Sequence, residues 1–540
     1  MKNAKKSYSP RILVFACNAC KFTDADGEAL NQQPLLANVR VLRTMCTGRV
    51  HPAYVMRAFD QGVDGVLITG CPPGKCDFIT GNEQAEASFR IVRNLARVIG
   101  IDDARLEFEW TDGSDAKTFR DLIIAFAGQV APLGSLPPLN TGELTPVAPA
   151  NIGEIGGELN ARLCYDCGKC TAVCPVTTVH EGFSPRRIVR NGEIHADSAW
   201  DLSNCISCSL CDYRCPQKVS ISTKIAVLRS AQFSASEGVQ RPHGAVFESL
   251  SNLMFREEMP ISHASWIPKG AKISEQGDTL LYVGCAPYHD AFFPNLDVRN
   301  LDAVVSSLKI LNHLGIAPMI LKDERCCGHD YYWSGDIAKF RRLAEMNKAR
   351  IEASGARRIV FTCPECRHAI QNLYSQVGLA LKLEMKSISE IISENIQQLN
   401  LQPTNLKVTF QDPCRQARSL GDTKSPREVM RSLPGVEFRE MAHSGAAATC
   451  CAGKWSHCDA GTKEIQSGRL NEAARTGADI LVTACPKCEI HLKCAMKGES
   501  HDFEIRDLAC VVAEALPDSA SDSVKKTINK SIHKESTVGA

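Results

Sequence analysis

The distribution of cysteine constrains this chain more than any other feature. The 540 residues include 26 cysteines, and most of them stand in short clusters. Disulfide-rich secreted proteins are mostly short chains behind a signal peptide, whereas clustered thiols in a reducing compartment are mostly metal ligands. The apolar run at residues 11–16 is only as long as a strand, so we expect no secretory signal and a cytoplasmic protein.

Two tandem cysteine runs share one spacing. In each, three cysteines at every third position are followed, four residues on, by a fourth cysteine and a proline. Thiolates are soft ligands that suit iron, and in two-cluster ferredoxins the fourth cysteine of such a run ligates the other cluster. The first predicted [4Fe–4S] cubane cluster has the ligands Cys164, Cys167, Cys170 and Cys215. The second has Cys174, Cys205, Cys208 and Cys211. Structural zinc is the alternative, because Cys-x2-Cys is also a zinc spacing.

An internal repeat occupies residues 279–510. In each copy a strand-like run precedes a first cysteine, an adjacent cysteine pair follows, and a second strand-like run precedes Cys-Pro-x-Cys. The ten cysteines are Cys285, Cys326, Cys327, Cys363 and Cys366 in the first copy, and Cys414, Cys450, Cys451, Cys485 and Cys488 in the second. Each copy is predicted to be a small α/β unit, and the two could pack about a pseudo-twofold axis. Five thiols are more than the four that a tetrahedral zinc site needs. The alternative to a cluster in each copy is therefore a zinc site with an additional buried thiol that is not a ligand.

The N-terminal stretch alternates strand-like and helix-like runs, which predicts an open parallel α/β sheet. Strands are expected at 11–16, 39–43, 65–69 and 105–110, and helices at 52–61, 82–99 and 116–130. Thiols that follow successive strands should meet at the carboxyl edge of the sheet. Five cysteines compete for four ligand places there, and spacing alone does not choose among Cys17, Cys20, Cys46, Cys71 and Cys76. The alternatives are zinc or a Rossmann-like domain with buried thiols, although no Gly-x-Gly-x-x-Gly follows a strand.

These patterns predict the division of the chain. The fold class is α/β, with an open parallel-sheet domain, a mainly helical two-cluster ferredoxin-like domain and a duplicated cysteine-rich α/β pair. The predicted parts are the N-terminal domain at 8–132, a linker at 133–158, the two-cluster domain at 159–232, a connecting segment at 233–278, the repeat copies at 279–400 and 401–515, and a disordered tail at 516–540.

Bulk composition is that of an ordinary soluble protein, with 44% hydrophobic and 23% charged residues. The net charge of +1 gives no electrostatic reason to expect nucleic acid or an anionic membrane as a partner. No apolar run approaches the length of about 20 residues that a membrane span needs.

Three stretches resemble known families. Residues 11–130, which carry Cys17-Asn-Ala-Cys20, Cys46-Thr-Gly-Arg49 and Cys71-Pro-Pro-Gly-Lys-Cys76, resemble the delta subunit of methyl-viologen-reducing hydrogenase. That resemblance implies one [2Fe–2S] cluster. Residues 161–229, with the two cysteine runs, resemble the C subunit of heterodisulfide reductases.

The repeat, from Thr279 to Cys488, resembles the B subunit of heterodisulfide reductases, and glycerol-3-phosphate, glycolate and lactate oxidation subunits have the same motif. In heterodisulfide reductases it implies one noncubane [4Fe–4S] cluster per copy, held by five cysteines, and cleavage of a disulfide between the two clusters. The sequence departs from the pattern in a slightly long first gap, in Gln411 where His is common, and in Ala452 where Gly is usual. No ligand is lost, so clusters are expected in both copies. The departures from the pattern do not indicate which disulfide is the substrate.

Other residues near the motifs have ordinary interpretations. Cys458, Cys494 and Cys510 are expected to be buried thiols rather than ligands. His289 and His329 stand near cluster motifs. Each could tune a cluster, donate a proton or simply pack against its neighbours.

The order of the three resemblances implies a function. Delta-type domains receive electrons from a hydrogenase or formate dehydrogenase and pass them to a separate flavin subunit, and the other two domains carry electrons from that flavin to a disulfide. This chain has no flavin domain of its own. The resemblance therefore implies an oxidoreductase subunit, acting on sulfur groups, of a heterodisulfide reductase-like complex of the flavin-based bifurcating kind. Its partners would be a flavin-containing A-like subunit, a hydrogenase, formate dehydrogenase or similar electron donor, ferredoxin and a disulfide substrate.

Two other functions compete. The first is an electron-transfer subunit of a glycolate, lactate or glycerol-3-phosphate dehydrogenase, which leaves residues 11–130 unexplained. The second is a non-catalytic redox sensor or scaffold. A sensor needs only one responsive cluster, whereas the cysteines of this chain are sufficient for five.

Overall fold

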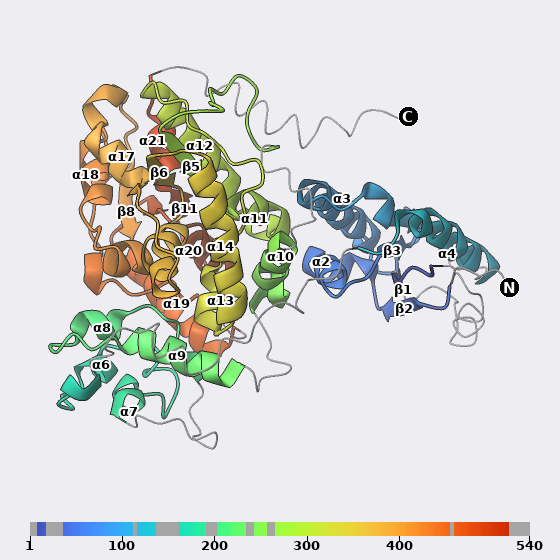
Figure 1. Cartoon of the computed structure of the whole chain (residues 1–540), viewed down its shortest axis with the longest axis horizontal. Coiled ribbons are helices and arrows are strands. Elements are labelled where there is room, and N and C mark those ends of the chain that lie inside the picture. The colour runs from blue at the N-terminus through green and yellow to red at the C-terminus, as the bar shows by residue number, and fades with distance from the viewer. Residues whose placement is uncertain are drawn as a thin grey trace.

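The computed structural model describes residues 8–17, 36–111, 116–136, 161–190, 202–233, 242–255, 265–453 and 458–517. Most of the predicted linker and tail, and Cys20, lie outside these described residues. Figure 1 shows the described parts as a large body of paired sheets, a small helical domain below it and the N-terminal domain to one side.

The N-terminal domain is built on a four-stranded parallel sheet in the order β2-β1-β3-β4. Its central strands are apolar and almost wholly buried, which is the pattern of a parallel sheet covered on both faces. The strands are β1 (Ile12–Cys17), β2 (Val39–Thr44), β3 (Gly65–Gly70) and β4 (Leu106–Trp110). The helices are α2 (Pro52–Asp60), α3 (Gly81–Ile99) and α4 (Ala116–Val130), with 3₁₀ turns η1 (Thr47–Arg49), η2 (Asp103–Arg105) and η3 (Ala131–Leu133). The parallel α/β prediction for this stretch is confirmed.

The described residues of the two-cluster domain, 161–190 and 202–233, form helices, turns and loops and no strand. Its helices are short because each cysteine loop interrupts them. They are α6 (Lys169–Ala172), α7 (Pro185–Arg190), α8 (Leu210–Arg214) and α9 (Ile221–Phe233), with turns η4 (Ala161–Leu163) and η5 (Leu202–Asn204). The connecting segment that follows contains η6 (Pro242–Ala245) and α10 (Val246–Phe255).

The two repeat copies have the same sheet. The strands run β5-β6-β7 in the first copy and β9-β8-β10-β11 in the second, all parallel. A bridge from Leu280 to Met319 extends the first sheet where β9 extends the second. The strands are β5 (Thr279–Tyr282), β6 (Arg358–Phe361), β7 (Glu384–Ser387), β8 (Lys407–Gln411), β9 (Glu437–Phe438), β10 (Ile480–Thr483) and β11 (Glu504–Asp507). The predicted duplication of an α/β unit is therefore present in the structure.

Helices surround both sheets. In the first copy they are α11 (Ala286–Phe292), α12 (Asn300–His313), α13 (His329–Ser334), α14 (Ile337–Ala353), α15 (Pro364–His368), α16 (Tyr374–Gln376) and α17 (Ile388–Glu394), with the 3₁₀ turns η7 (Pro294–Leu296) and η9 (Ile396–Leu399) and the π-helical segment η8 (Ala369–Leu373). In the second they are α18 (Ser425–Ser432), α19 (Ala460–Ala474), α20 (Pro486–Met496) and α21 (Leu508–Glu514), with the π-helical segment η10 (Arg415–Ser419) and the 3₁₀ turn η11 (Gly445–Ala447). Within the part of the chain that the structure describes, none of the helices has the length and apolar character to cross a bilayer.

The copies pack about a pseudo-twofold axis. Helix α12 of the first copy contacts α21 of the second, and α17 of the first contacts α18 of the second. Since α12 corresponds to α18 and α17 to α21, these are the same contact made twice. One apolar core, with Leu281 and Val360 from the first copy and Phe410 and Val482 from the second, runs through both.

Helix α10 joins the N-terminal domain to this body. It packs on α2 of that domain and on α13 and α14 of the first copy. Asn252 Nδ2 donates a hydrogen bond to Asp60 Oδ2 at 2.9 Å across the contact. The connecting segment, in which the sequence offers no recognisable motif, is thus a structural junction.

Candidate redox sites

Four thiols meet at the carboxyl edge of the N-terminal sheet. Cys17 ends β1 and Cys71 follows β3, and their Sγ atoms are 3.4 Å apart. Cys46 and Cys76 lie together against the start of α3, where a Cβ on Gly81 would overlap Cys46 Sγ and stand 3.1 Å from Cys76 Sγ. The absence of a side chain at this glycine is what lets the two thiols approach the helix.

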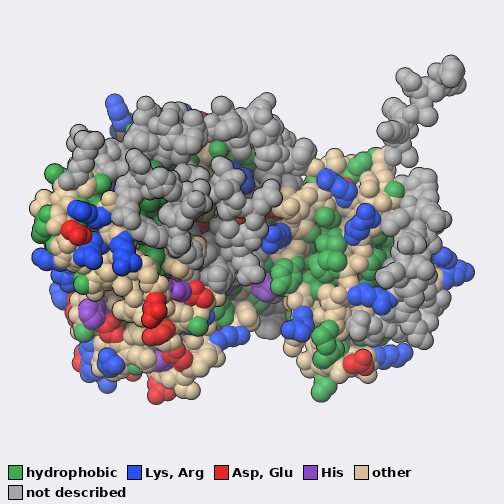
Figure 2. Space-filling model, turned by 90° about the horizontal axis from the view of Figure 1, so that it is seen from below, with side chains coloured by type: hydrophobic (Ala, Val, Ile, Leu, Met, Phe, Trp, Pro, Cys, Tyr) green, Lys and Arg blue, Asp and Glu red, His purple; other side chains and the backbone are tan. Residues whose placement is uncertain are grey.

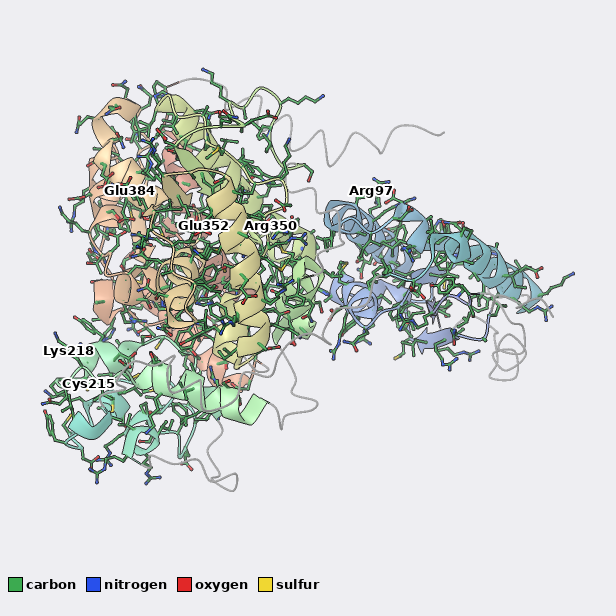
Figure 3. All side chains as sticks on the ribbon, in the orientation of Figure 1. Arg97, Cys215, Lys218, Arg350, Glu352 and Glu384 are labelled. Carbon is green, nitrogen blue, oxygen red and sulfur yellow. The ribbon has the colours of Figure 1, made fainter. Side chains whose placement is uncertain are left out.

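The first set of two-cluster cysteines lines one cavity of about 360 Å³. Its thiols are those of Cys164, Cys167, Cys170 and Cys215, so the last cysteine of the second run joins the first three of the other run. Figure 3 labels Cys215 and Lys218 at the left side of this domain. Cys167 is exposed. This thiol set is therefore the one nearer to solvent.

The second set is deeper. Burial, and then the nearby thiols of Cys208 and Cys205, raise the pKa of Cys174 to about 12. Burial, together with Asp212 and these same thiols, also raises the pKa of Cys211 well above its usual value. The structure thus brings Cys174 to the other three cysteines of the second set.

All five cysteines of the first repeat copy line a cavity of about 360 Å³, which is bounded by Cys285, Cys326, Cys327, Cys363 and Cys366. Ser251 Oγ, from α10, donates a hydrogen bond to Cys326 Sγ at 3.2 Å. Gly284 has a φ of +61°, and a Cβ there would lie 2.7 Å from Cys366 Sγ. Only glycine fits this backbone next to a thiol.

The five cysteines of the second copy line a larger cavity of about 850 Å³, bounded by Cys414, Cys450, Cys451, Cys485 and Cys488. Its other walls combine charged side chains with apolar and aromatic ones, which include Phe247 of α10 and Ile206 of the two-cluster domain.

Three charged residues line both cavities: Asp330, Glu365 and Lys487. Lys487 Nζ contacts Asp330 Oδ1, lies 3.2 Å from Glu365 Oε2 and stands 4.8 Å from the centre of the Phe247 ring. Burial opposes the charged form of Asp330, but the Lys487 ammonium holds the pKa of that carboxyl well below its usual range. The two five-thiol cavities therefore meet at one buried ion-pair group.

The second cavity also adjoins the two-cluster domain. Arg418, four residues after Cys414, donates from Nε to the carbonyl oxygen of Cys208 at 2.6 Å and from Nη1 to the Ala448 oxygen at 2.8 Å. Although burial favours its neutral form, the nearby thiols, Cys208 first, keep the pKa of Arg418 above its usual value. The deeper thiol set of the two-cluster domain thus lies against the second copy.

Both histidines singled out in the sequence line the first cavity. Burial lowers the pKa of His289 to about 4, and its Nδ1 lies 3.0 Å from Asn300 Nδ2. His329 Nε2 accepts a hydrogen bond from Arg415 Nε at 3.1 Å. Both imidazoles are therefore held in place by neighbours at the wall of a thiol cavity.

The three remaining cysteines stand apart from the cavities lined by the other thiols. Cys458 is exposed, so the expectation of a buried thiol is wrong there, because the residue lies on the loop that leads into α19. Cys494 Sγ accepts a hydrogen bond from Lys463 Nζ at 3.2 Å, and Ser306 Oγ lies 3.7 Å from Cys510 Sγ. Their surroundings are those of ordinary protein thiols.

Sequence reasoning missed Ser251, Phe247, Arg418 and Lys487. Of these, Lys487 left a recognisable signal, since it and Glu365 occupy the same position of the two Cys-Pro-x-Cys motifs with opposite charge. The other three reach the sites from segments that carry no motif of their own.

Three family models match separate parts of the chain. The delta subunit of methyl-viologen-reducing hydrogenase matches residues 12–134. A 4Fe–4S dicluster domain matches 159–220, and a cysteine-rich domain matches twice, at 279–371 and 408–493.

Curated relatives span several of these parts. The D subunit of a dihydromethanophenazine:CoB–CoM heterodisulfide reductase from Methanosarcina barkeri is 26% identical over 67% of this chain and 95% of the relative. The B subunit of a fumarate reductase (CoM/CoB) from Methanothermobacter marburgensis is 24% identical over 63% of this chain and 68% of the relative.

A third relative matches only the N-terminal part. The A subunit of a ferredoxin/F420H2-dependent CoB–CoM heterodisulfide reductase from Methanosarcina acetivorans is 35% identical over 133 residues, which are 25% of this chain and 17% of the relative. The chain therefore joins a hydrogenase delta-subunit domain, a 4Fe–4S dicluster domain and two cysteine-rich domains, and its relatives are iron–sulfur electron-transfer subunits that include those of heterodisulfide reductases.

Proposed function

We propose that this chain is the disulfide-reducing and electron-transfer subunit of a heterodisulfide reductase-like complex, which carries electrons to and from a separate flavin subunit. The observation that supports it best is the meeting of two five-thiol cavities at Asp330, Glu365 and Lys487. A relay needs one cluster at its exit, whereas two clusters beside one pocket suit a reaction that takes two electrons.

The thiol sets fit the clusters that the families imply. We assign a [2Fe–2S] cluster to the four described N-terminal thiols, namely Cys17, Cys46, Cys71 and Cys76. Two cubane clusters go to the two sets of the dicluster domain, and one noncubane [4Fe–4S] cluster goes to each five-thiol cavity. Gly81 and Gly284 support this fit, because neither has a side chain that would occupy the space beside the neighbouring thiol.

The reaction is the reduction of a disulfide by two electrons and two protons to two thiols. When bound, the noncubane clusters would each supply one electron at the pocket. The protein contributes an apolar wall, in which Phe247 and Tyr331 exclude water, and the Lys487 ammonium, whose positive charge stabilises negative charge that develops on the two sulfur atoms. The carboxylates of Asp330 and Glu365 fix that ammonium between the cavities.

Electrons would enter the pocket through the second copy. The deeper thiol set of the dicluster domain contacts it at Arg418, while the outer set reaches solvent at Cys167. The flavin subunit would therefore dock at the outer set, and a hydrogenase, formate dehydrogenase or similar donor would serve the N-terminal domain. The relatives do not favour a dehydrogenase subunit or a redox sensor.

A single-turnover experiment tests the function. The anaerobic, fully reduced chain should be reoxidised within one turnover by a small-molecule disulfide, with two equivalents of thiol formed for each disulfide consumed. Cluster absorbance and thiol titration follow the two sides of the reaction. Reoxidation by a quinone or by a protein acceptor, with no response to any disulfide, would replace this proposal with a role as a dehydrogenase subunit.

Metal content tests the cluster assignment. Anaerobically purified protein should carry about 18 iron atoms per chain, because the thiol sets suit four clusters of four irons and one of two. Iron and zinc are measured together by mass spectrometry. About 8 irons accompanied by zinc would leave only the dicluster assignment standing.

A further inference from the structure

Exposed apolar side chains gather around the N-terminal thiols. Among the described residues, ten large apolar side chains are exposed, and five of these belong to segments that flank the thiol site. The five are Leu42, Met45, Tyr54, Phe78 and Ile79. Met45 directly precedes Cys46, and Phe78 and Ile79 follow Cys76 closely. An apolar patch of this kind on a soluble surface marks an interaction site.

Ile79 is the extreme member of this patch. Its side chain is 85% exposed and its φ is +63°, a left-handed conformation that is unfavourable for a β-branched residue. Neither burial nor backbone preference accounts for isoleucine at this position. A contact outside the chain does account for it, because strained and exposed residues persist where function needs them.

Positive charge predominates around the patch, in which Asp77, between Cys76 and Phe78, is an exposed acidic residue. Residues 39–57 contain four arginines, Arg40, Arg43, Arg49 and Arg57, and no acidic residue, whereas the whole chain is almost balanced at 62 basic and 61 acidic residues. All four arginines are exposed, as is Lys75 in the segment of Cys76. Figure 2 shows hydrophobic side chains between Lys and Arg side chains on the right-hand lobe, which is the N-terminal domain.

We propose that this basic apolar surface docks an acidic protein that carries a one-electron iron–sulfur centre. The proposal rests on the proposed redox role of the N-terminal thiol site. One electron passes per encounter, the partner centre is oxidised and the N-terminal centre is reduced, and no atom is transferred. Arginines around the patch steer the acidic partner, and the apolar centre excludes water from the contact. A second copy of this chain is disfavoured as occupant, because two such basic surfaces repel each other.

Binding of an acidic plant-type [2Fe–2S] ferredoxin to the full chain tests the surface. We expect binding in calorimetric titrations at low salt that is lost as salt increases. The double variant Arg43→Glu/Arg49→Glu should weaken this binding about tenfold or more, and Ile79→Ser should weaken it at every salt concentration. The matched control is Arg97→Glu, near the far end of α3, which should bind as the wild type does.

Stopped-flow reduction of the N-terminal centre supplies the second readout. Reduced ferredoxin should reduce the double variant about tenfold more slowly at low salt, while reduced viologen, which needs no docking surface, reduces both proteins at comparable rates. If the wild type and the double variant bound ferredoxin equally and were reduced by it at equal rates, the docking proposal alone would be overturned. The same would hold if the double variant differed from the wild type only in its oligomeric state. An N-terminal site that neither donor can reduce would overturn the redox role as well.

Discussion

Disulfide reduction by reduced viologen should fall by about a hundredfold or more in both Cys327→Ser and Cys451→Ser. Each substitution removes one of the five thiols around one cavity, and both thiols are buried. Because a disulfide takes two electrons, one intact cluster should not compensate for the loss of the other. Steady-state turnover with a small-molecule disulfide measures the effect.

Low-temperature paramagnetic resonance checks that the damage is local. The signals of the dicluster domain should survive in both variants, since its thiols belong to separate cavities. Cys458→Ser is the matched control, because that thiol is exposed, and it should retain activity. If Cys327→Ser erased every cluster signal while the protein stayed folded, the division of the thiols into independent sites would be wrong.

Gly335→Ala should be among the most destabilising single substitutions in the chain, at about 3 kcal/mol. The residue ends α13 with a φ of +98°, and a Cβ there would lie 2.7 Å from the carbonyl carbon and oxygen of Arg229 in α9. The obstacle is backbone, which cannot rotate away. Arg229 also spans this junction, since its Nη1 donates to Trp333 O and to Ser207 Oγ, both at 2.9 Å.

The expected result is a lower melting temperature together with slower electron transfer from the dicluster domain to the disulfide pocket. Thermal unfolding and single-turnover kinetics measure the two effects. Gly355→Ala is the control, because Gly355 has a φ of +71° and a Cβ there would have no heavy atom within 4 Å, so only the strain of about 1 kcal/mol applies. Equal losses in the two variants would show that the close approach to Arg229 does not matter.

Local pattern is sufficient for much of the fold. It predicts strands at 39–43 and 65–69, and the structure has them at Val39–Thr44 and Gly65–Gly70. The second of these is easy to recognise because a strand buried on both faces must be continuously apolar. The duplicated sheet is predictable for a similar reason, since the same strand-then-cysteine order occurs in both copies.

Contacts between distant segments are not predictable from local pattern. Ser251 reaches Cys326, and Phe247 lies over Lys487, from a helix whose sequence has no cysteine and no recognisable spacing. These contacts depend on where α10 packs, which is decided jointly by its own apolar residues and by the surfaces of α2, α13 and α14. A motif names the ligands of a site but leaves the residues around them to tertiary packing.

The ion pair on the pseudo-twofold axis has an evolutionary consequence. Glu365 and Lys487 hold the same position in the two copies and meet each other. In an ancestral homodimer of one copy, the residue at this position would have faced its own twin, and two like charges buried together are strongly unfavourable. Opposite charges at this position require two copies that carry different residues, as the two copies within this chain do. The single chain can thus place one fixed cation between two equivalent five-thiol sites, an asymmetry that a symmetric dimer is unable to encode.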